Sequence, residues 1–133
     1  MYTFGKHERL CAGRLIESLH ESGHRLVSFP FVIRWMTCQA NDFASPAQVL
    51  IVAPKRKLHH AVDRNRAKRL MRECYRLHKP ELYTFLDQHN AKVAIALNYI
   101  HTDLLPYDSM NRKYERALAS LEQDIAQCLA SKL

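Results

Sequence analysis

Several features that would indicate particular classes of protein are scarce or missing in this 133-residue chain. It has only three Gly and five Pro, which argues against a disordered or low-complexity chain. No run of about 18 apolar residues exists, and the most apolar segment, LVSFPFVIRWM, is interrupted by Pro30 and Arg34, so no membrane span is expected. The N-terminus lacks the basic-then-apolar pattern of a signal peptide, so we expect a cytoplasmic location.

Patterns typical of metal sites are also missing. The cysteines show no CxxC spacing, and none lies at close ligand spacing from a histidine; they are Cys11, Cys38, Cys74 and Cys128. We expect them to be structural, reduced thiols. His59 and His60 are adjacent and do not share a helix face, so contact with phosphate or a role in a turn is favoured over a metal pair.

The chain also lacks a recognisable catalytic constellation. It has no glycine-rich phosphate-binding loop, and five of its six aspartates, Asp42, Asp63, Asp87, Asp103 and Asp108, lie apart along the chain without forming a paired-carboxylate motif. A nuclease that works without a partner needs such a set. The sequence therefore favours a binding role over independent catalysis.

Positive charge, in contrast, is abundant and concentrated in one stretch. Residues 55–79, KRKLHHAVDRNRAKRLMRECYRLHK, hold ten of the twenty Lys and Arg residues but only two of the thirteen acidic ones. This stretch has a net charge of +8, and the remainder of the chain has a net charge of −1. Such a local concentration of cations predicts a polyanionic partner, and nucleic acid is the main candidate.

The basic stretch has the periodicity of an amphipathic helix. At helical spacing its apolar residues share one face, with Leu77 at the border: Ala67, Leu70, Met71 and Cys74. The other face carries Asn65, Lys68, Arg69, Arg72 and Arg76. Cations four residues apart, such as Arg72 and Arg76, repel each other. One face is therefore predicted to pack on a core and the other to bind an anion.

The first half of the chain predicts one helix and two strands. Residues 1–8 are expected to form an irregular arm with Phe4 as a possible anchor, and a helix over 9–22 ends at Gly23. A strand is predicted over 26–38, with Pro30 near its start or an edge, and a loop follows. A short apolar strand over 48–53 is expected to form a hairpin with the first strand and to lead, after Pro54, into the basic helix.

The second half predicts another strand and a final helix. The segment ELYTFLDQHN after Pro80 could be either helical or a loop. Residues 91–99 alternate as a central strand does, and the strand is expected to be parallel to its neighbour. The last helix, capped by Asp108 or Ser109, presents an apolar stripe of Tyr114, Leu118, Leu121, Ile125 and Cys128. The order αββαβα predicts one domain over residues 1–133, an α/β (α+β) sandwich with one mixed sheet packed by helices.

The motif AVDRNRAKRLMRECYR at residues 61–76 resembles the signature of the protein subunit of bacterial ribonuclease P, AVxRNRxKRxxRE after a strand and a basic turn. The matching residues are Ala61, Val62, Arg64, Asn65, Arg66, Lys68, Arg69, Arg72 and Glu73. Outside this helix the likeness covers nearly the whole chain as a pattern. It includes the Arg9-Leu10 pair, Gly23 and the Phe31-Val32 pair.

The resemblance implies a fold and an activity that the residues alone do not. The fold would contain a left-handed βαβ crossover, although right-handed crossovers are the general rule. The activity would be removal of the 5′ leader of precursor tRNA, catalysed by ribonuclease P RNA with Mg²⁺ bound mainly by that RNA. The partners would be this RNA and precursor tRNA, with no membrane and no DNA.

The resemblance also implies residue roles. The catalytic RNA would be bound by Lys55, Arg56, Lys57, Arg64, Asn65, Arg66, Lys68, Arg69, Arg72 and Arg76. A cleft between the first helix and the sheet would hold the leader and be lined by Ile16, His20, Phe29, Phe31 and Trp35. For Phe31 and Trp35, core packing is an equal alternative. Ile16 and His20 stand where many members have aromatics, and His59 where a glycine is common.

Two other functions are compatible with charge and periodicity. A non-catalytic structural RNA-binding protein, such as a ribosomal component, would need the same cationic helix. A metal-dependent protein nuclease is a third possibility, and it would need ligands that the sequence does not group. The extended motif favours the ribonuclease P subunit over both.

Overall fold

The computed structural model describes residues 5–131, so the predicted anchor Phe4 lies outside the described residues. The elements follow in the order η1 (Lys6–Glu8), α1 (Gly13–Ser22), β1 (His24–Ser28), β2 (Phe31–Thr37), β3 (Ala47–Val52), α2 (Ala61–Gln88), β4 (Val93–Tyr99) and α3 (Tyr107–Ala130). The predicted order therefore lacks one strand. The single strand expected over 26–38 is two strands, separated by a tight turn at Phe29 and Pro30.

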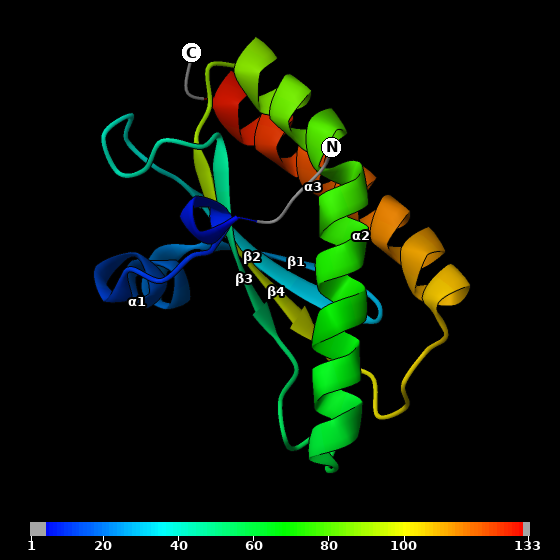
Figure 1. Ribbon diagram of the computed structural model, residues 1–133. Coiled ribbons are helices and arrows are strands. Elements are labelled where there is room, and N and C mark those ends of the chain that lie inside the picture. The colour runs from blue at the N-terminus through cyan, green and yellow to red at the C-terminus, as the bar shows by residue number, and fades with distance from the viewer. Residues whose placement is uncertain (1–4, 132–133) are drawn as a thin grey trace.

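The four strands form one mixed sheet in the order β1-β2-β4-β3 (Figure 1). β1 and β2 are antiparallel, as are β2 and β4, whereas β3 and β4 are parallel. The parallel arrangement of the strand after α2 was predicted and is confirmed. The expected hairpin between the strand over 26–38 and that over 48–53 is wrong, because β4 lies between β2 and β3.

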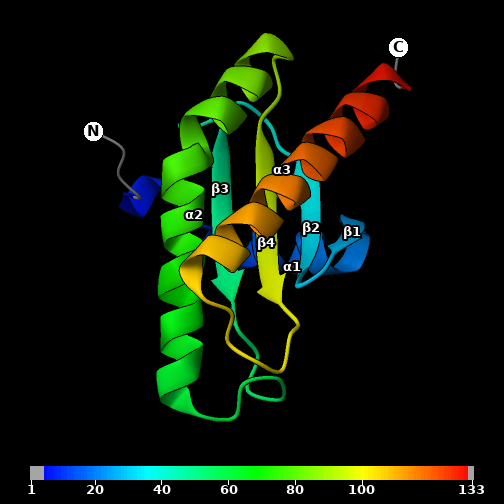
Figure 2. The ribbon, with the colours of Figure 1, turned by 90° about the vertical axis from the view of Figure 1, so that its right-hand side faces the viewer.

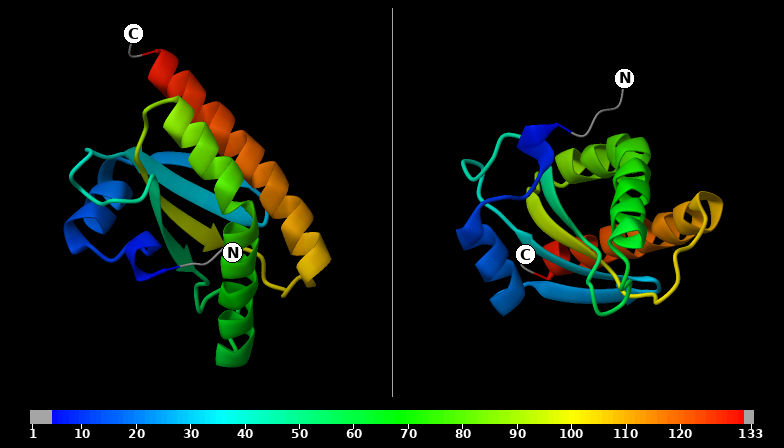
Figure 3. Two further views of the ribbon diagram at one scale, coloured as in Figure 1. Left: turned by 45° about the horizontal axis from the view of Figure 1, so that its top comes forward. Right: turned by 60° about the horizontal axis from the view of Figure 1, so that its bottom comes forward.

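The helices cover the two faces of the sheet unequally. α1 lies on one face, and α2 and α3 lie together on the other (Figure 3). Figure 2 looks onto the face covered by α2 and α3, with β3 to the left of β4 and both strands pointing down. The chain leaves β3, returns through α2 in front of the sheet, and enters β4 on the right, so this crossover is left-handed.

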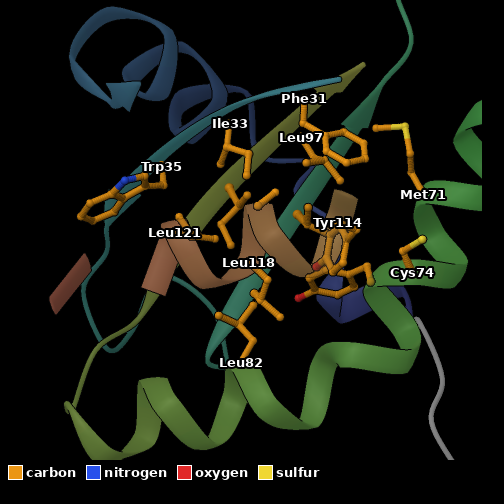
Figure 4. Close-up of a cluster of buried hydrophobic side chains, with 14 of the residues drawn as sticks. Phe31, Ile33, Trp35, Met71, Cys74, Leu82, Leu97, Tyr114, Leu118 and Leu121 are labelled. Carbon is orange, nitrogen blue, oxygen red and sulfur yellow. The ribbon is translucent and has the colours of Figure 1, made fainter. Parts of the chain in front are cut away.

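The larger core lies between the sheet and the pair α2 and α3 (Figure 4). Inward-facing residues of β2 and β4 meet apolar residues of both helices; they include Phe31, Ile33, Trp35, Ile95, Leu97, Met71, Cys74, Tyr114, Leu118 and Leu121. The indole Nε1 of Trp35 donates a hydrogen bond of 2.8 Å to Oδ2 of Asp124 on α3. This pair satisfies the polar group of a fully buried tryptophan and ties α3 to β2.

A smaller core joins α1 to the opposite face. Leu15 and Leu19 of α1 are buried against Ala94 and Ala96 of β4. The helix ends as predicted at Gly23, whose amide donates a 3.0 Å hydrogen bond to the carbonyl of Leu19. A Cβ at position 23 would come within 2.4 Å of that oxygen, so the close approach requires glycine.

The sequence left the end of one helix open, and the start of another differs from the prediction. α2 continues through Pro80 to Gln88, because Leu82 and Leu86 extend its buried face. α3 begins at Tyr107, after Pro106, with no side-chain cap, so the prediction of Asp108 or Ser109 as the cap is wrong. The predicted apolar stripe of α3 is confirmed from Tyr114 to Ile125. Within residues 5–131, none of the helices is long and apolar enough to cross a membrane.

Candidate nucleic-acid interface

A cationic turn connects β3 to α2. The amides of Lys57 and Leu58 both donate to the carbonyl of Pro54, at 3.1 and 3.2 Å, and the Leu58 side chain is buried beneath the turn. Lys55 and Arg56 are exposed. The turn therefore presents its cations at the carboxyl end of β3, directly before the first helical turn of α2, where backbone amides favour an anion.

The cationic face of α2 is exposed along its first half. Ala67, Met71 and Cys74 point into the core, as Figure 4 shows for Met71 and Cys74. Burial raises the pKa of the Cys74 thiol to about 12, so it remains a neutral core residue. The opposite side exposes Asn65, Arg66, Arg69 and Arg72, and Lys68 is half-buried. The two predicted faces of this helix are confirmed.

Arg76 is the exception among the predicted contacts, because it has an acidic partner on its own helix. Its Nε and Nη2 donate to the two carboxylate oxygens of Glu73 at 3.0 and 2.5 Å. These hydrogen bonds lower the pKa of Glu73 and raise that of Arg76. The cationic face available to a polyanion is therefore centred on the first three turns of α2.

Arg64 shapes the turn that precedes its helix. Its Nη1 donates to the carbonyls of Leu58 and His59 at 3.0 and 2.8 Å. One guanidinium thus ties the first turn of α2 to the connection from β3. Arg64 therefore positions the cations at residues 55–57, in addition to contributing its own charge.

We expect Arg64→Lys to weaken RNA binding about threefold to tenfold although the net charge is unchanged. A lysine ammonium cannot reproduce the guanidinium geometry at both carbonyls, and one lost hydrogen bond is equivalent to about 0.5–1.5 kcal/mol. Filter binding of the cognate RNA measures the change. Arg112→Lys is the matched control, because Arg112 is an exposed arginine of α3 and lies outside the surface assigned to RNA. Equal effects of the two substitutions would contradict the role given to Arg64.

A groove of about 390 Å³ lies on the face of the sheet that α1 occupies. Its lining comes from α1, three strands and the cationic turn: His20, Arg25, Val32, Arg34, Pro54, Arg56, Lys57, Asn98 and Ile100. Arg25 of β1 and Arg34 of β2 are direct cross-strand partners. Like charges at opposed positions repel each other. No carboxylate occurs among the described lining residues, so an anion in this groove would relieve the repulsion.

The structure separates the residues predicted to line the cleft. His20 lines the groove, Ile16 is half-buried in the α1 core, and Phe29 is exposed at the turn between β1 and β2. Phe31 and Trp35 are fully buried on the other face of the sheet, beneath α3. The prediction that these two line the cleft is wrong, because the pleat directs them toward α2 and α3.

Sequence reasoning missed several groove residues. Arg34 had a signal: it interrupts the apolar run between Ile33 and Trp35, so the alternation of a strand places it on the opposite face from both. Asn98 has the same signal in β4. No signal in the sequence indicated Arg25, because its place in the groove depends on the register of the hairpin that β1 forms with β2.

The described part of the chain offers binding groups rather than a metal centre. In residues 5–131 there is no cluster of three or more His, Cys, Asp or Glu residues that could hold a metal ion. All four cysteines are unpaired thiols. The groups at the turn, on α2 and in the groove are guanidinium, ammonium and amide groups, which bind phosphate oxygens.

Comparison with known proteins gives a consistent result. The family model described as "Ribonuclease P" matches residues 4–122. The ribonuclease P protein component of Porphyromonas gingivalis is 30% identical over 92% of this chain and 90% of that protein. The corresponding protein of Chlorobium phaeobacteroides is 33% identical over 93% and 84%. The fold resembles the RNase P protein of Staphylococcus aureus, with a TM-score of 0.65 and 21% identity over 86% of this chain and 94% of that one.

Proposed function

Because the chain belongs to the ribonuclease P protein family, we propose that it binds the catalytic RNA of ribonuclease P and the 5′ leader of precursor tRNA. In this role it assists removal of the leader to give the mature 5′ end of tRNA. The observation that carries the proposal is the exposed cationic face of α2, which contains the residues of the family motif. We place this activity in the cytoplasm.

The catalytic RNA is assigned to the turn at residues 55–57 and to the first three turns of α2. Arg66, Arg69 and Arg72 are exposed and lie three residues apart, so their side chains follow one side of the helix. Guanidinium groups bind phosphate oxygens in a bidentate geometry. This arrangement suits the closely spaced phosphates of a folded RNA better than a single small anion.

The leader is assigned to the groove beside α1. Its floor is apolar at Val32 and Ile100, and cations from β1, β2 and the turn surround it. A single-stranded RNA presents bases and phosphates together, and cationic grooves with apolar floors bind such strands. The turn at residues 55–57 contributes to both surfaces, so the leader would lie next to the catalytic RNA.

Hydrolysis is assigned to the RNA subunit, with Mg²⁺ bound mainly by that RNA. Mg²⁺ prefers carboxylate and phosphate oxygens, and the cations of this surface do not supply such ligands. Bound Mg²⁺ would provide the nucleophilic hydroxide and stabilise the leaving oxygen. The protein's cations hold the phosphates of both RNAs together and reduce their mutual repulsion, so that less free Mg²⁺ is needed.

Reconstitution with the cognate RNA tests this function directly. At low Mg²⁺, we expect the protein to raise kcat/KM for cleavage of precursor tRNA about tenfold or more over RNA alone. A tenfold change corresponds to about 1.4 kcal/mol, which one or two charge-assisted contacts supply. The stimulation should decrease as Mg²⁺ is raised. Equal rates with and without the protein at every Mg²⁺ concentration would refute the proposal.

A further inference from the structure

The side chains of β1 that lie on the same side of the sheet as α1 extend the surface of the groove along this strand. Arg25 and Val27 flank Leu26, which packs on the large core, so both face the side of α1, and Phe29 follows in the turn after the strand. Arg25 lines the groove, and Val27 and Phe29 are 52% and 53% exposed. Among the described residues, Phe29 is the one Phe, Tyr or Trp side chain that is exposed. The groove therefore continues onto an edge strand, and the turn after that strand carries an exposed aromatic ring.

Phe29 is paired with a histidine from the segment that follows β4. The ring centroids of Phe29 and His101 are 5.0 Å apart, and the rings are tilted by 51°. Ile100, the neighbour of His101, lines the groove, and its amide donates a 2.8 Å hydrogen bond to the carbonyl of Pro30. The aromatic pair thus adjoins the end of the groove.

Contacts with Asp103 and Tyr99 fix the orientation of the His101 imidazole. Nδ1 of His101 accepts a 3.3 Å hydrogen bond from the amide of Asp103, which leaves Nε2 as the protonated nitrogen of the neutral ring. Tyr99 stacks on His101 at 6.4 Å and 25°, and its hydroxyl donates to the carbonyl of Asp103 at 2.6 Å. A ring fixed in this way loses little conformational entropy when a ligand binds.

We propose that Phe29 and His101 form a stacking site for one nucleobase of the RNA strand whose phosphates Arg25 and Arg34 hold. The inference rests on the proposed function and adds a base-binding position to it. Single-stranded RNA is the occupant that fits, because the adjoining groove carries five basic side chains: His20, Arg25, Arg34, Arg56 and Lys57. Aromatic faces accept any base, so this site would determine position along the leader more than sequence.

The test uses the complete holoenzyme and precursor tRNAs that carry 2-aminopurine at successive leader positions. Stacking quenches the fluorescence of 2-aminopurine. The substrate labelled at one leader position should therefore lose fluorescence with the natural protein and recover it with Phe29→Leu. For leaders that reach this position, Phe29→Leu should weaken substrate binding on the order of tenfold, within the range for one base stacked on one ring. Shorter leaders should bind both proteins equally, and Phe29→Trp should restore quenching.

Phe85→Leu is the matched control. Phe85 pairs with His89 at 4.3 Å, with the same tilt of 51°, but this pair lies at the end of α2, near the opposite end of β4. Phe85→Leu should leave the quenching, and the dependence of substrate binding on leader length, unchanged. Equal leader affinity for the natural protein and Phe29→Leu would overturn the stacking site while leaving the proposed function intact, whereas lack of stimulation by the natural protein would refute that function. Dimers in sedimentation that Phe29→Leu abolishes would also overturn the stacking site, because Phe29 would then serve as an interface between copies.

Discussion

Reversing two charges on α2, in the variant Arg69→Glu and Arg72→Glu, is expected to weaken binding of the catalytic RNA about 100-fold or more at moderate salt. Both side chains are exposed and belong to the uniformly cationic side of the helix. A hydrogen bond to a charged group is equivalent to about 1.5–3 kcal/mol, so the loss of two such contacts exceeds the roughly 2.7 kcal/mol that corresponds to 100-fold. The new carboxylates would add repulsion.

The salt dependence of binding distinguishes these contacts from an indirect effect. Each phosphate contact contributes about 0.9 to the slope of log K against log salt for a duplex, so the slope should decrease by about 2. The matched control is Arg112→Glu and Arg116→Glu, which changes net charge equally through two exposed arginines of α3. This control should keep the natural slope and lose only a fewfold in affinity. A similar loss in both variants would mean that net charge alone governs binding.

The parts of this surface that the sequence predicted are those that depend on local periodicity. The separation of Met71 and Cys74 from Arg69 and Arg72 follows from 3.6 residues per turn, whatever the rest of the fold is. The strand near residues 93–99 and the stripe of α3 follow from periodicity in the same way.

The parts that were wrong depend on contacts between distant segments. Pro30 interrupts the largely apolar segment 26–38, but a proline is compatible both with the start of a strand and with a turn, so the turn at Phe29 and Pro30 was not predicted. Phe31 and Trp35 share one face of β2, as a period of two residues requires, but the choice of face depends on which helix covers it. Since both faces of β2 are partly covered, side-chain type does not settle the choice. The left-handedness of the crossover between β3 and β4 was also predicted only from the family resemblance.

Pro80 shows how tertiary packing can outweigh a local signal. A proline removes one backbone hydrogen bond and usually ends or kinks a helix. Here α2 continues, because Leu82 and Leu86 beyond the proline are buried in the same core as Met71. The extension also places Tyr83 beside the N-terminal segment, where Tyr83 and Lys79 both contact Glu8.

Lys79→Met is the second large effect that we expect, and it concerns stability. The Nζ of Lys79 lies 2.9 Å from Oε2 of Glu8, and these side chains are 12% and 3% exposed. Removing one partner of a buried pair leaves a charge unpaired, which destabilises by about 3–5 kcal/mol. We expect a loss of about 3 kcal/mol, at the lower end of this range, because the Tyr83 hydroxyl and the Gly5 amide still donate to Glu8, at 2.5 and 3.0 Å. Chemical denaturation measures it.

A double variant tests whether the loss of stability comes from the unpaired buried charge of Glu8. Glu8→Gln together with Lys79→Met leaves no buried charge, so much of the lost stability should return. Arg14→Met is the matched control for loss of an ion pair, because Arg14 pairs with Asp42 at 2.9 Å but its side chain is 67% exposed. We expect it to change the free energy of unfolding by at most about 1 kcal/mol. Equal losses in Lys79→Met and Arg14→Met would show that burial of the Glu8 pair contributes nothing.

The pH dependence of unfolding provides an independent measure of the same pair. Burial by itself would raise the pKa of Glu8, but the hydrogen bonds from Tyr83, Gly5 and Lys79 outweigh it and lower the pKa below the ordinary 4.5. The folded state therefore binds the Glu8 proton more weakly than the unfolded chain does. This stabilisation is complete above the unfolded-state pKa and is lost as the pH falls through the lower folded-state value. Glu8→Gln should thus flatten the acid limb of the stability curve, and an unchanged limb would mean that Glu8 is not held as a carboxylate between α2 and the N-terminal segment.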